Sequence, residues 1–471
     1  METVLIKALQ LLCCLSLLVV LHEGGHFGFS KLFGVRVEKF YMFFDYKFHL
    51  FSTKSKWFTK LFPRFKDNET EYGIGWIPLG GYVKIAGMVD ESMDTEQLKQ
   101  PAQADEFRSQ KVWKRFFIMF GGVLMNLITA WVIYSLLLLC WGRDYVAMSS
   151  ITDGFQFNEQ AKEIGFQDGD QLLAADGKKI VEYSTAVVRT IANAKTVTVL
   201  REGEEIELTM PDGLSMINML QSVPQFLQPK AEAIIDSVEP GMAADKACIK
   251  AGMRLLSVND HPIQTWGDFD YEFVLRRDDV LSAPGCTAAD SAQWRQLEVV
   301  YASADMSRMD TVMLQLDESY RMGVTRRMPN YEIIHLDYTV ANCFSAGLEY
   351  GWRVLKSYVS DLKYVASKDG AKSVGSFITI GSIFPSAWDW QKFWEMTAFI
   401  SIILAVMNIL PIPGLDGGHI VLLFYEGLTG RQPSDKVMEW IEKIGIGILL
   451  LLMVLAMSND VRNFILPLLG L

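Results

Sequence analysis

The chain has 471 residues, half of them apolar, and carries 44 Lys and Arg against 55 Asp and Glu. This acidic balance excludes a typical nucleic-acid-binding protein, and the apolar content excludes an intrinsically disordered one. Six cysteines in so long a chain, two of them adjacent in an apolar run, do not form a disulfide framework.

The first predicted element is a membrane helix over 1–34. Its apolar run at 8–21 is short enough to be typical of a signal peptide, but no small-residue cleavage site follows it. Instead, apolar residues continue at helical spacing after residue 21, and His and Glu residues lie among them. We therefore predict one spanning helix with a polar inner face.

The polar residues of this helix form the motif His22-Glu23-Gly24-Gly25-His26. Residues four apart lie about one helical turn apart, so both imidazoles face the same side and can share one zinc ion. Glu23 is placed to act as the general base that takes a proton from water activated by the metal. Such side chains are costly inside a membrane unless they are paired, ligated or hydrated, which favours a functional site over a chance match.

The segment 35–112 is predicted to be a cytoplasmic loop. Nine Lys and Arg lie within 31–66 against two acidic residues, and short loops rich in basic residues stay on the cytoplasmic side. The N-terminus, the segment 142–392 and the C-terminus then lie outside. Residues 41–74 are rich in Phe, Lys and Trp and contain no motif; such side chains favour the depth of the lipid headgroups.

A second membrane helix is predicted over 113–141, which has no charge after Arg115. It carries Asn126 about one turn after Gly121 and Gly122, and glycines allow two helices to pack closely. The Asn126 amide could hydrogen-bond a neighbouring helix or reach a substrate at the metal. The sequence by itself favours the packing role.

The polar middle of the chain contains a repeat. Residues 161–180 align without gaps on 244–263, and each copy is typical of a short helix, a Gly turn, a strand and a tight turn. The pair resembles tandem PDZ domains of the circularly permuted bacterial kind, at 145–212 and 231–317. PDZ domains bind extended peptides by strand addition; the alternative is two small β-rich domains without a peptide ligand. Residues 277–295 interrupt the second copy and are predicted to form a surface loop.

An amphipathic helix is predicted over 341–368, because apolar residues recur at steps of three or four from Phe344 onward. It could lie on the membrane surface or pack on the PDZ pair.

The third predicted span, 393–420, has an interrupted end. Pro411 and Pro413 end its helix, and the broken backbone that follows carries Asp416 and His419. Polar side chains on broken backbone at membrane depth need protein or a water cavity around them. A catalytic zinc needs three protein ligands and an open position. Both Asp416 and His419 are therefore candidates for the third ligand, and the sequence does not separate them.

The last span is predicted over 437–457. The fold class that follows is a multi-span α-helical membrane protein, with about four transmembrane helices and two inserted β-rich PDZ domains.

Three motifs together carry a family resemblance. H-E-G-G-H in the first span, G-x-x-x-N in the second and N-x-x-P-x-P-x-L-D-G-G-H in the third strongly resemble the site-2 protease family of intramembrane zinc metalloproteases. The stretch 75–88 matches the membrane-associated β-hairpin of that family. With paired PDZ domains between the second and third spans, the order resembles the bacterial sigma-E regulator type over nearly the whole chain.

The resemblance implies that His22, His26 and Asp416 ligate Zn²⁺ and that Glu23 is the base. It decides between Asp416 and His419 in favour of the aspartate. It also implies a group of residues that position an unwound substrate strand, by contact beside the metal or by strand pairing with the hairpin: Asn126, Asn408, Pro411 and Pro413 for the former, and Gly80, Gly81 and Tyr82 for the latter.

The implied function is cleavage of single-span membrane proteins, such as anti-sigma factors or remnant signal peptides, within the bacterial inner membrane. The N-terminus and the PDZ pair then face the periplasm, where the pair acts as a size filter or binds peptide, and the active site lies near the cytoplasmic side. One alternative is a membrane PDZ scaffold with a structural or vestigial metal site, which the intact Glu23 disfavours. Another is a metal transporter, which would need more His or acidic residues in the other spans.

Overall fold

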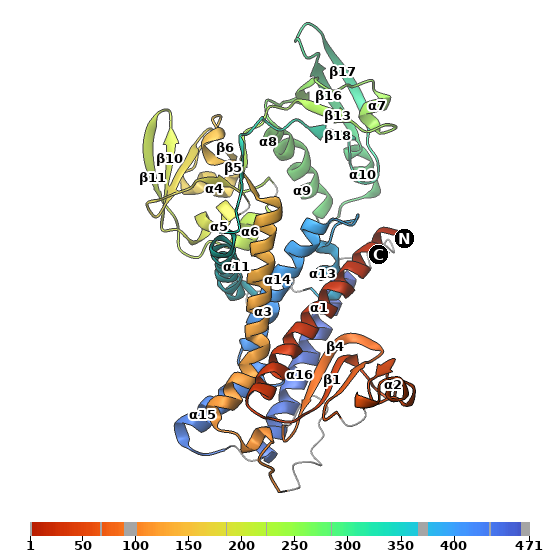
Figure 1. The fold of residues 1–471 in the computed structure, drawn as a ribbon. Coiled ribbons are helices and arrows are strands. Elements are labelled where there is room, and N and C mark those ends of the chain that lie inside the picture. The colour runs from red at the N-terminus through yellow and green to blue at the C-terminus, as the bar shows by residue number, and fades with distance from the viewer. Residues whose placement is uncertain are drawn as a thin grey trace. The chain divides into compact units, whose positions relative to one another are not determined.

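The computed structural model describes residues 2–65, 68–88, 101–184, 186–222, 224–283, 285–365, 375–432 and 435–462 (Figure 1). The chain divides into two compact units, Met1–Arg143 with Asp337–Leu471, and Asp144–Leu336. Four of the described helices are long and apolar enough to cross a membrane: Thr3–Leu32, Val112–Trp141, Trp390–Ile409 and Lys443–Asp460. The prediction of about four spanning helices combined with β-rich domains is confirmed at this level.

The spanning helices of the first unit are α1 (Glu2–Leu32), α3 (Val112–Trp141), α14 (Trp390–Ile409) and α16 (Asp435–Asp460). Helix α3 is central, because α1 and α14 both pack along it. It ends at Gly142, whose φ of +65° is readily available only to glycine. These contacts place the motif helix α1 against the glycines of α3.

The predicted third span contains a break rather than one continuous helix. After α14, Leu410 is extended, as expected for a residue before proline, and Gly414 has a φ of +85°. A new helix, α15 (Asp416–Thr429), then begins. Its Gly417 lies so close to the preceding loop that a Cβ would stand 2.1 Å from the Leu410 oxygen. The glycines after Asp416 thus let the two helix ends and their loop pack tightly.

The predicted cytoplasmic loop forms a four-stranded sheet in the order β2-β3-β1-β4. Its elements are β1 (Val37–Phe44), β2 (Phe51–Ser52), β3 (Glu71–Ile74) and β4 (Ile77–Ile85), with the short helix α2 (Lys56–Leu61) following β2. Strand β1 pairs parallel to β3 and antiparallel to β4. The expected hairpin over 75–88 is wrong, because most of this stretch is the single strand β4, which pairs with β1. Strand β4 is an edge strand of this sheet.

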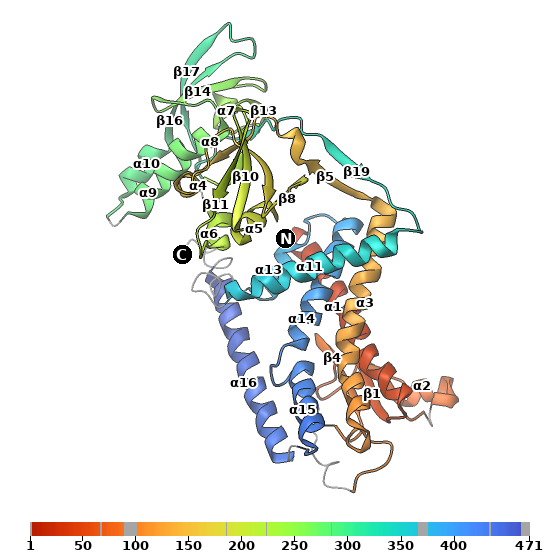
Figure 2. The ribbon, with the colours of Figure 1, turned by 90° about the vertical axis from the view of Figure 1, so that its left-hand side faces the viewer.

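The amphipathic helix is α11 (Cys343–Val365); residues 366–368 of the predicted segment lie outside the described residues. Figure 2 shows it running across α3 and α14. Tyr350, Val354 and Tyr358 pack on the cluster formed by those two helices. The buried face of α11 thus contacts the spanning helices, while Leu348 and Trp352 on its other face stay exposed. The short helix α13 (Phe377–Ile383) packs against α1.

The second unit contains two β-rich halves with the same strand order. The first sheet is β11-β10-β7-β8 and the second is β17-β16-β14-β15. Strand β7 (Gln171–Ala175) lies at the same place in the repeat as β14 (Arg254–Val258), and β8 (Lys178–Lys179) corresponds to β15 (His261–Pro262). The ungapped sequence repeat is thus a duplicated structure. The remaining strands of these sheets are β10 (Thr196–Arg201), β11 (Glu204–Thr209), β16 (Gln296–Ala302) and β17 (Met309–Gln315).

Each half extends past its predicted end. Strand β12 (Leu227–Pro229) pairs with β6 (Phe155–Phe157), and β18 (Val324–Arg326) pairs with β13 (Ile235–Val238). The limits at 212 and 317 miss these strands because only the central part of each copy carries the repeat signal. A three-stranded sheet, β19-β5-β9, is formed by Ile333–Leu336, Arg143–Ala147 and Glu182–Tyr183.

The helices of the second unit are short. In the first half they are α4 (Glu159–Ile164), α5 (Ala186–Asn193) and α6 (Met216–Gln221), and in the second α7 (Ala243–Lys246), α8 (Trp266–Phe269), α9 (Arg276–Ser282) and α10 (Ala288–Trp294). The surface loop predicted over 277–295 is wrong, because α9 and α10 occupy most of it. Helix α10 begins with a capping box between Thr287 and Asp290, which satisfies free amides of its first turn.

Candidate metal centre

His22 and His26 lie one turn apart on α1, as their spacing predicts, and their Nε2 atoms are 3.3 Å apart. Helix α3 approaches them through Gly122, where a Cβ atom would stand 2.5 Å from Cε1 of His22 and from Nε2 of His26. Gly25 and Gly121 meet at the same crossing with backbone in contact. The three glycines therefore create the space in which the two rings lie.

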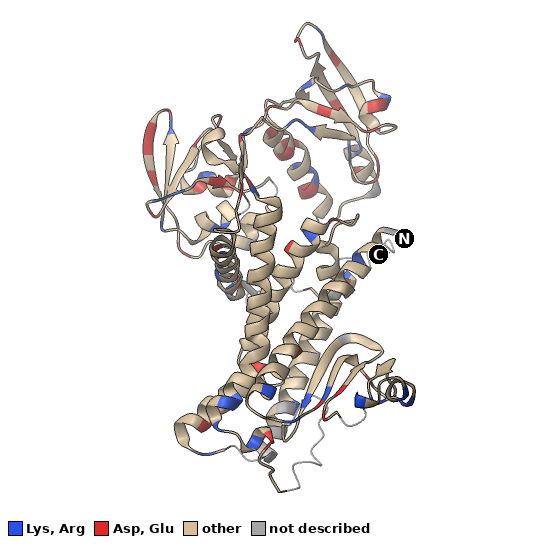
Figure 3. Cartoon of the chain, viewed as in Figure 1, with Lys and Arg blue, Asp and Glu red and all other residues tan. Residues whose placement is uncertain are grey.

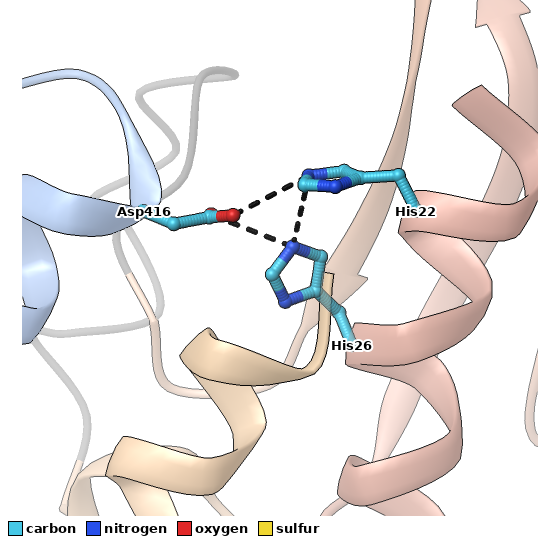
Figure 4. Close-up of side chains that lie close together, drawn as sticks. All are labelled: His22, His26 and Asp416. Atoms are coloured by element: carbon cyan, nitrogen blue, oxygen red, sulfur yellow. Dashed lines mark hydrogen bonds and ion pairs between the residues drawn. The ribbon is translucent and has the colours of Figure 1, made fainter. Parts of the chain in front are cut away.

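Asp416 supplies the third side chain of the centre from the first turn of α15 (Figure 4). Its Oδ2 lies 3.4 Å from Nε2 of His22, and its Oδ1 lies 3.4 Å from Nε2 of His26. One ligand atom from each of the three residues lies within 4.8 Å of the others. His419, the rival candidate, is absent from this group among the described residues.

The three side chains fit a zinc ion in both distance and chemistry. A tetrahedral ion with bonds of about 2.0–2.1 Å holds its ligand atoms about 3.3–3.4 Å apart. The distances between His22, His26 and Asp416 match this spacing. Oδ2 of Asp416 is also buried and has no hydrogen-bond partner among the described residues. A buried carboxylate oxygen in that position is costly unless a cation lies beside it.

The ligand rings have contacts on the side away from Asp416. Nδ1 of His26 lies 2.9 Å from the Ile118 main-chain oxygen, and Nδ1 of His22 lies 3.2 Å from the Asn126 amide. Asn126 is fully buried, and its Oδ1 has no hydrogen-bond partner among the described residues. A 180° turn of the amide would present Oδ1 to an Nδ1–H of His22. Asn126 thus lies behind the His22 ring and does not line the cavity.

A cavity of about 110 Å³ opens onto His22, His26 and Asp416. Glu23 lines it, and so do Asn408 and His419. The opposite wall belongs to strand β4, through Gly81, Tyr82, Val83 and Ile85. The edge strand of the sheet therefore borders the same space as the ligands and the acidic residue next to His22.

The other predicted positioning residues do not line this cavity. Gly80 lies on β4 beside the ring of Phe44, with a φ of +156°. Pro411 and Pro413 shape the loop before Asp416, where a Cβ on Gly445 of α16 would stand 1.9 Å from the Pro413 oxygen. The prolines thus act on the path of the loop and not by contact in the cavity.

Polar side chains tie the sheet together outside the spanning helices. The Glu71 carboxylate accepts hydrogen bonds from the Tyr41 hydroxyl at 2.7 Å and the Ser52 hydroxyl at 2.5 Å. Burial opposes ionisation, but these hydrogen bonds and the nearby Lys39 hold the pKa of Glu71 below its usual value. Burial raises the pKa of Tyr41. Tyr82 on β4 stacks on Tyr41, with ring centroids 5.6 Å apart.

A buried ion pair holds α15 to α3 and was missed by the sequence reasoning. The Arg115 guanidinium donates to the Glu426 carboxylate, which also accepts from the Gln432 amide at 3.0 Å. The signal was available: Glu426 is the acidic residue in the mostly apolar stretch that follows His419 in α15, and such residues need a partner. The main-chain oxygen of Ile118, by contrast, carries no signal in the residue pattern.

Comparison with known proteins places the chain in a family. The model of peptidase family M50 matches residues 10–452. The regulator of sigma-E protease RseP of Escherichia coli K12 is 26% identical over 478 residues, covering 95% of this chain and 96% of that protein. Protease RseP of Yersinia pestis is 27% identical over 486 residues, covering 98% and 99%. A Neisseria meningitidis protein whose name describes a zinc metalloprotease is 26% identical over 487 residues, covering 97% and 99%.

These matches run through the spanning helices and the β-rich unit alike. With a family model that extends over nearly the whole sequence, the chain belongs to peptidase family M50, the site-2 proteases, and is a zinc metalloprotease.

Proposed function

We propose that this protein is an intramembrane endopeptidase that cleaves single-span membrane proteins within the bilayer. One observation carries the proposal: the triad of His22, His26 and Asp416 borders a cavity shared with Glu23 and with a sheet edge, between helices apolar enough to span a membrane. Hydrolysis there needs a polar space for water and an extended substrate segment. The cavity and the edge strand offer these two things.

In this proposal His22, His26 and Asp416 are the zinc ligands. Bound zinc supplies Lewis acidity, which favours loss of a proton from water and polarises a peptide carbonyl. The Glu23 carboxylate takes the proton from the attacking water and then gives it to the amide nitrogen of the leaving segment. His26 is held by the Ile118 oxygen so that its Nε2 lone pair faces Asp416.

Strand β4 is proposed as the binding element for the substrate backbone. A helix that enters the site must lose hydrogen bonds before its carbonyls are accessible, and in a membrane these bonds must be replaced. The outer edge of β4 can replace them by strand addition next to the ligands. Gly81 and Tyr82 lie on that edge, and Gly80 shapes it.

Two asparagines are proposed to have separate roles. Asn408 lines the cavity, and its amide lies 3.3 Å from Nε2 of His22; once zinc occupies that nitrogen, the amide can hydrogen-bond the substrate strand. Asn126 is a positioning residue, because it contacts His22 from outside the cavity. Pro411 and Pro413 keep the loop before Asp416 out of helix, so that the carboxylate meets the two histidines.

The surroundings of the site are proposed from charge and repeat. The basic residues of 31–66 face the cytoplasm of a bacterium, so the N-terminus lies outside the inner membrane and the centre lies near its cytoplasmic side. The two β-rich halves are PDZ domains that exclude large substrates or bind peptide in the periplasm. Relatives named as regulators of sigma-E support anti-sigma factors as one substrate class.

Purified wild-type protein and the Glu23→Gln variant, incubated with a panel of single-span proteins in detergent, test the proposal. We expect cuts inside the apolar segment by mass spectrometry, lost on zinc chelation and lowered on the order of 10²–10⁴-fold in the variant. Bound zinc should stay unchanged in Glu23→Gln. Glu395→Gln, a matched change in the second turn of α14 at a residue that does not line the cavity, should retain cleavage. Equal cleavage by wild type and Glu23→Gln would contradict the proposed role of Glu23 as general base.

A further inference from the structure

The segment 46–65, between β1 and β3, has a composition unlike the rest of the sheet. It contains five Lys and Arg and no acidic residue, together with seven aromatic residues: Lys47, Lys54, Lys56, Lys60 and Arg64, and Tyr46, Phe48, Phe51, Trp57, Phe58, Phe62 and Phe65. In Figure 3 the charged residues of α2 are all basic. This combination of aromatic and basic residues is typical of protein surfaces at lipid headgroups.

Helix α2 (Lys56–Leu61) divides these residues among different faces. Phe58 turns inward and meets Phe51, Phe62 and Phe65, with ring centroids 5.0–5.5 Å away. Trp57 and Leu61, four residues apart and hence on one face, remain 60% and 65% exposed. The helix has no buried residue at all. An apolar stripe is therefore left uncovered by the chain.

The basic residues lie next to this stripe. Lys56 and Lys60 are again four apart, one position before Trp57 and Leu61, so they flank the apolar face. Among the described residues no salt bridge engages Lys54, Lys56, Lys60 or Arg64. The charges of Lys56, Lys60 and Arg64 are thus available to an external anion, whereas Lys54 also lies near the Glu71 carboxylate.

The place of α2 in the fold relates this surface to the membrane. The sheet packs along α1 through β1 and β4, and Lys31 at the end of that spanning helix forms an ion pair with Glu69 at 2.8 Å. Helix α2 directly follows β2, the edge strand opposite β4. The exposed stripe therefore belongs to the edge of the sheet that does not border the cavity.

We propose that the segment 46–65 is a membrane anchor that binds anionic phospholipid headgroups in the leaflet at the C-terminal end of α1. Trp57 and Leu61 enter the headgroup region, and the flanking lysines and Arg64 bind the phosphates. The anchor fixes the β2 edge of the sheet and leaves the β4 edge free. It does not depend on the zinc site or on the proposed proteolysis.

Hydrogen exchange of the full chain in nanodiscs tests the anchor. One set of discs contains phosphatidylcholine alone and the other contains phosphatidylcholine with phosphatidylglycerol. We expect peptides covering 54–62 to exchange more slowly, on the order of tenfold, in the anionic discs. Replacing Lys54, Lys56, Lys60 and Arg64 by Gln should abolish that difference. The matched control, Gln at Lys178, Lys179, Arg189 and Lys195 of the second unit, should preserve it.

A second measurement reports depth and does not depend on how well the charge variant folds. The fluorescence of Trp57 is the difference in emission between wild type and Trp57→Phe. In discs whose lipids are brominated near the headgroup, we expect the bromines to quench this fluorescence. Equal exchange in both kinds of disc, with an unquenched Trp57, would overturn the proposal. Protection that is the same in both discs and rises with protein concentration would assign the stripe to a second copy of the chain, and would overturn it as well.

Discussion

Nδ1 of His26 on α1 lies 2.9 Å from the main-chain oxygen of Ile118 on α3. Because a carbonyl oxygen only accepts hydrogen bonds, this Nδ1 carries the ring proton, and Nε2 directs its lone pair toward Asp416. Such a contact fixes the orientation of a ligating histidine and raises its basicity. The candidate metal centre thus depends on the backbone of α3 as well as on the side chains of His22, His26 and Asp416.

Replacing Gly122 by Ala should weaken zinc binding on the order of 10–100-fold. The new Cβ would stand 2.5 Å from both histidine rings, so the rings or the helix must move. Zinc affinity can be measured by competition with a chelator. Gly28→Ala is the matched control on α1, because its Cβ would meet nothing within 4 Å. It should bind zinc normally, and a similar loss in both variants would contradict the steric explanation.

Asn126→Ala and Asn408→Ala should separate ligand orientation from substrate contact. The first variant loses the partner of His22 Nδ1, so its zinc affinity should fall on the order of 10–100-fold. The second loses an amide that lines the cavity and contacts His22 at Nε2, the nitrogen that zinc would occupy, so its cleavage rate should fall more than its zinc affinity. The readouts are chelator competition and cleavage at saturating zinc. If both variants lose zinc equally, the two asparagines share one role.

Glu426→Ala should lower the free energy of unfolding by about 3–5 kcal/mol, since it leaves the buried Arg115 charge without its carboxylate. The loss is measured by denaturation of the detergent-solubilised protein. Changing the pair together, Arg115→Met with Glu426→Leu, should recover much of that stability, because it removes both buried charges. A double variant as unstable as Glu426→Ala would show that the pair is needed for more than charge balance.

Glu71 should make the stability of the sheet depend on pH. Its pKa is lowered in the folded protein, so its contribution is full above the ordinary glutamate value and is lost as pH falls through the lowered pKa. Glu71→Gln should therefore reduce the melting temperature at neutral pH, and the gap to wild type should close in acid. Glu69→Gln, which removes only an exposed ion pair with Lys31, should leave the profile nearly unchanged.

Part of the centre could be predicted because it rests on helical periodicity. His22 and His26 are four residues apart, and this spacing alone places them on one face. The choice between Asp416 and His419 could not be made that way, because both lie in the first turn of α15. It depends on how α15 approaches α1, which is set by the broken loop and the glycines at 417 and 418.

The sheet shows where local reasoning fails. A hairpin over 75–88 assumes that this stretch turns back and pairs with itself, whereas most of it is the single strand β4. Here β3 and β4 are separated by only two residues, yet β1 lies between them. The duplicated halves of the second unit could be predicted more readily, because the sequence repeat indicated that both contain the same elements in the same order. Their outer strands, Leu227–Pro229 and Val324–Arg326, pair over long sequence distances and had no repeat to mark them.

The β-rich unit leaves and rejoins the rest of the chain through neighbouring strands. Strand β5 begins the unit and β19 ends it, and the two strands are neighbours in one sheet. Nδ1 of His335 on β19 lies 2.5 Å from Oδ1 of Asp144 on β5. Adjacent strands stand about 5 Å apart. Because the ends of Asp144–Leu336 lie so close together, this folded insertion links the helices on either side of it as a tight turn would. The conformational entropy lost in holding those helices together is therefore little larger than for a short loop. An insertion with this geometry can be replaced by another domain, or lengthened, without changing the distance between the two points where it joins the helical unit.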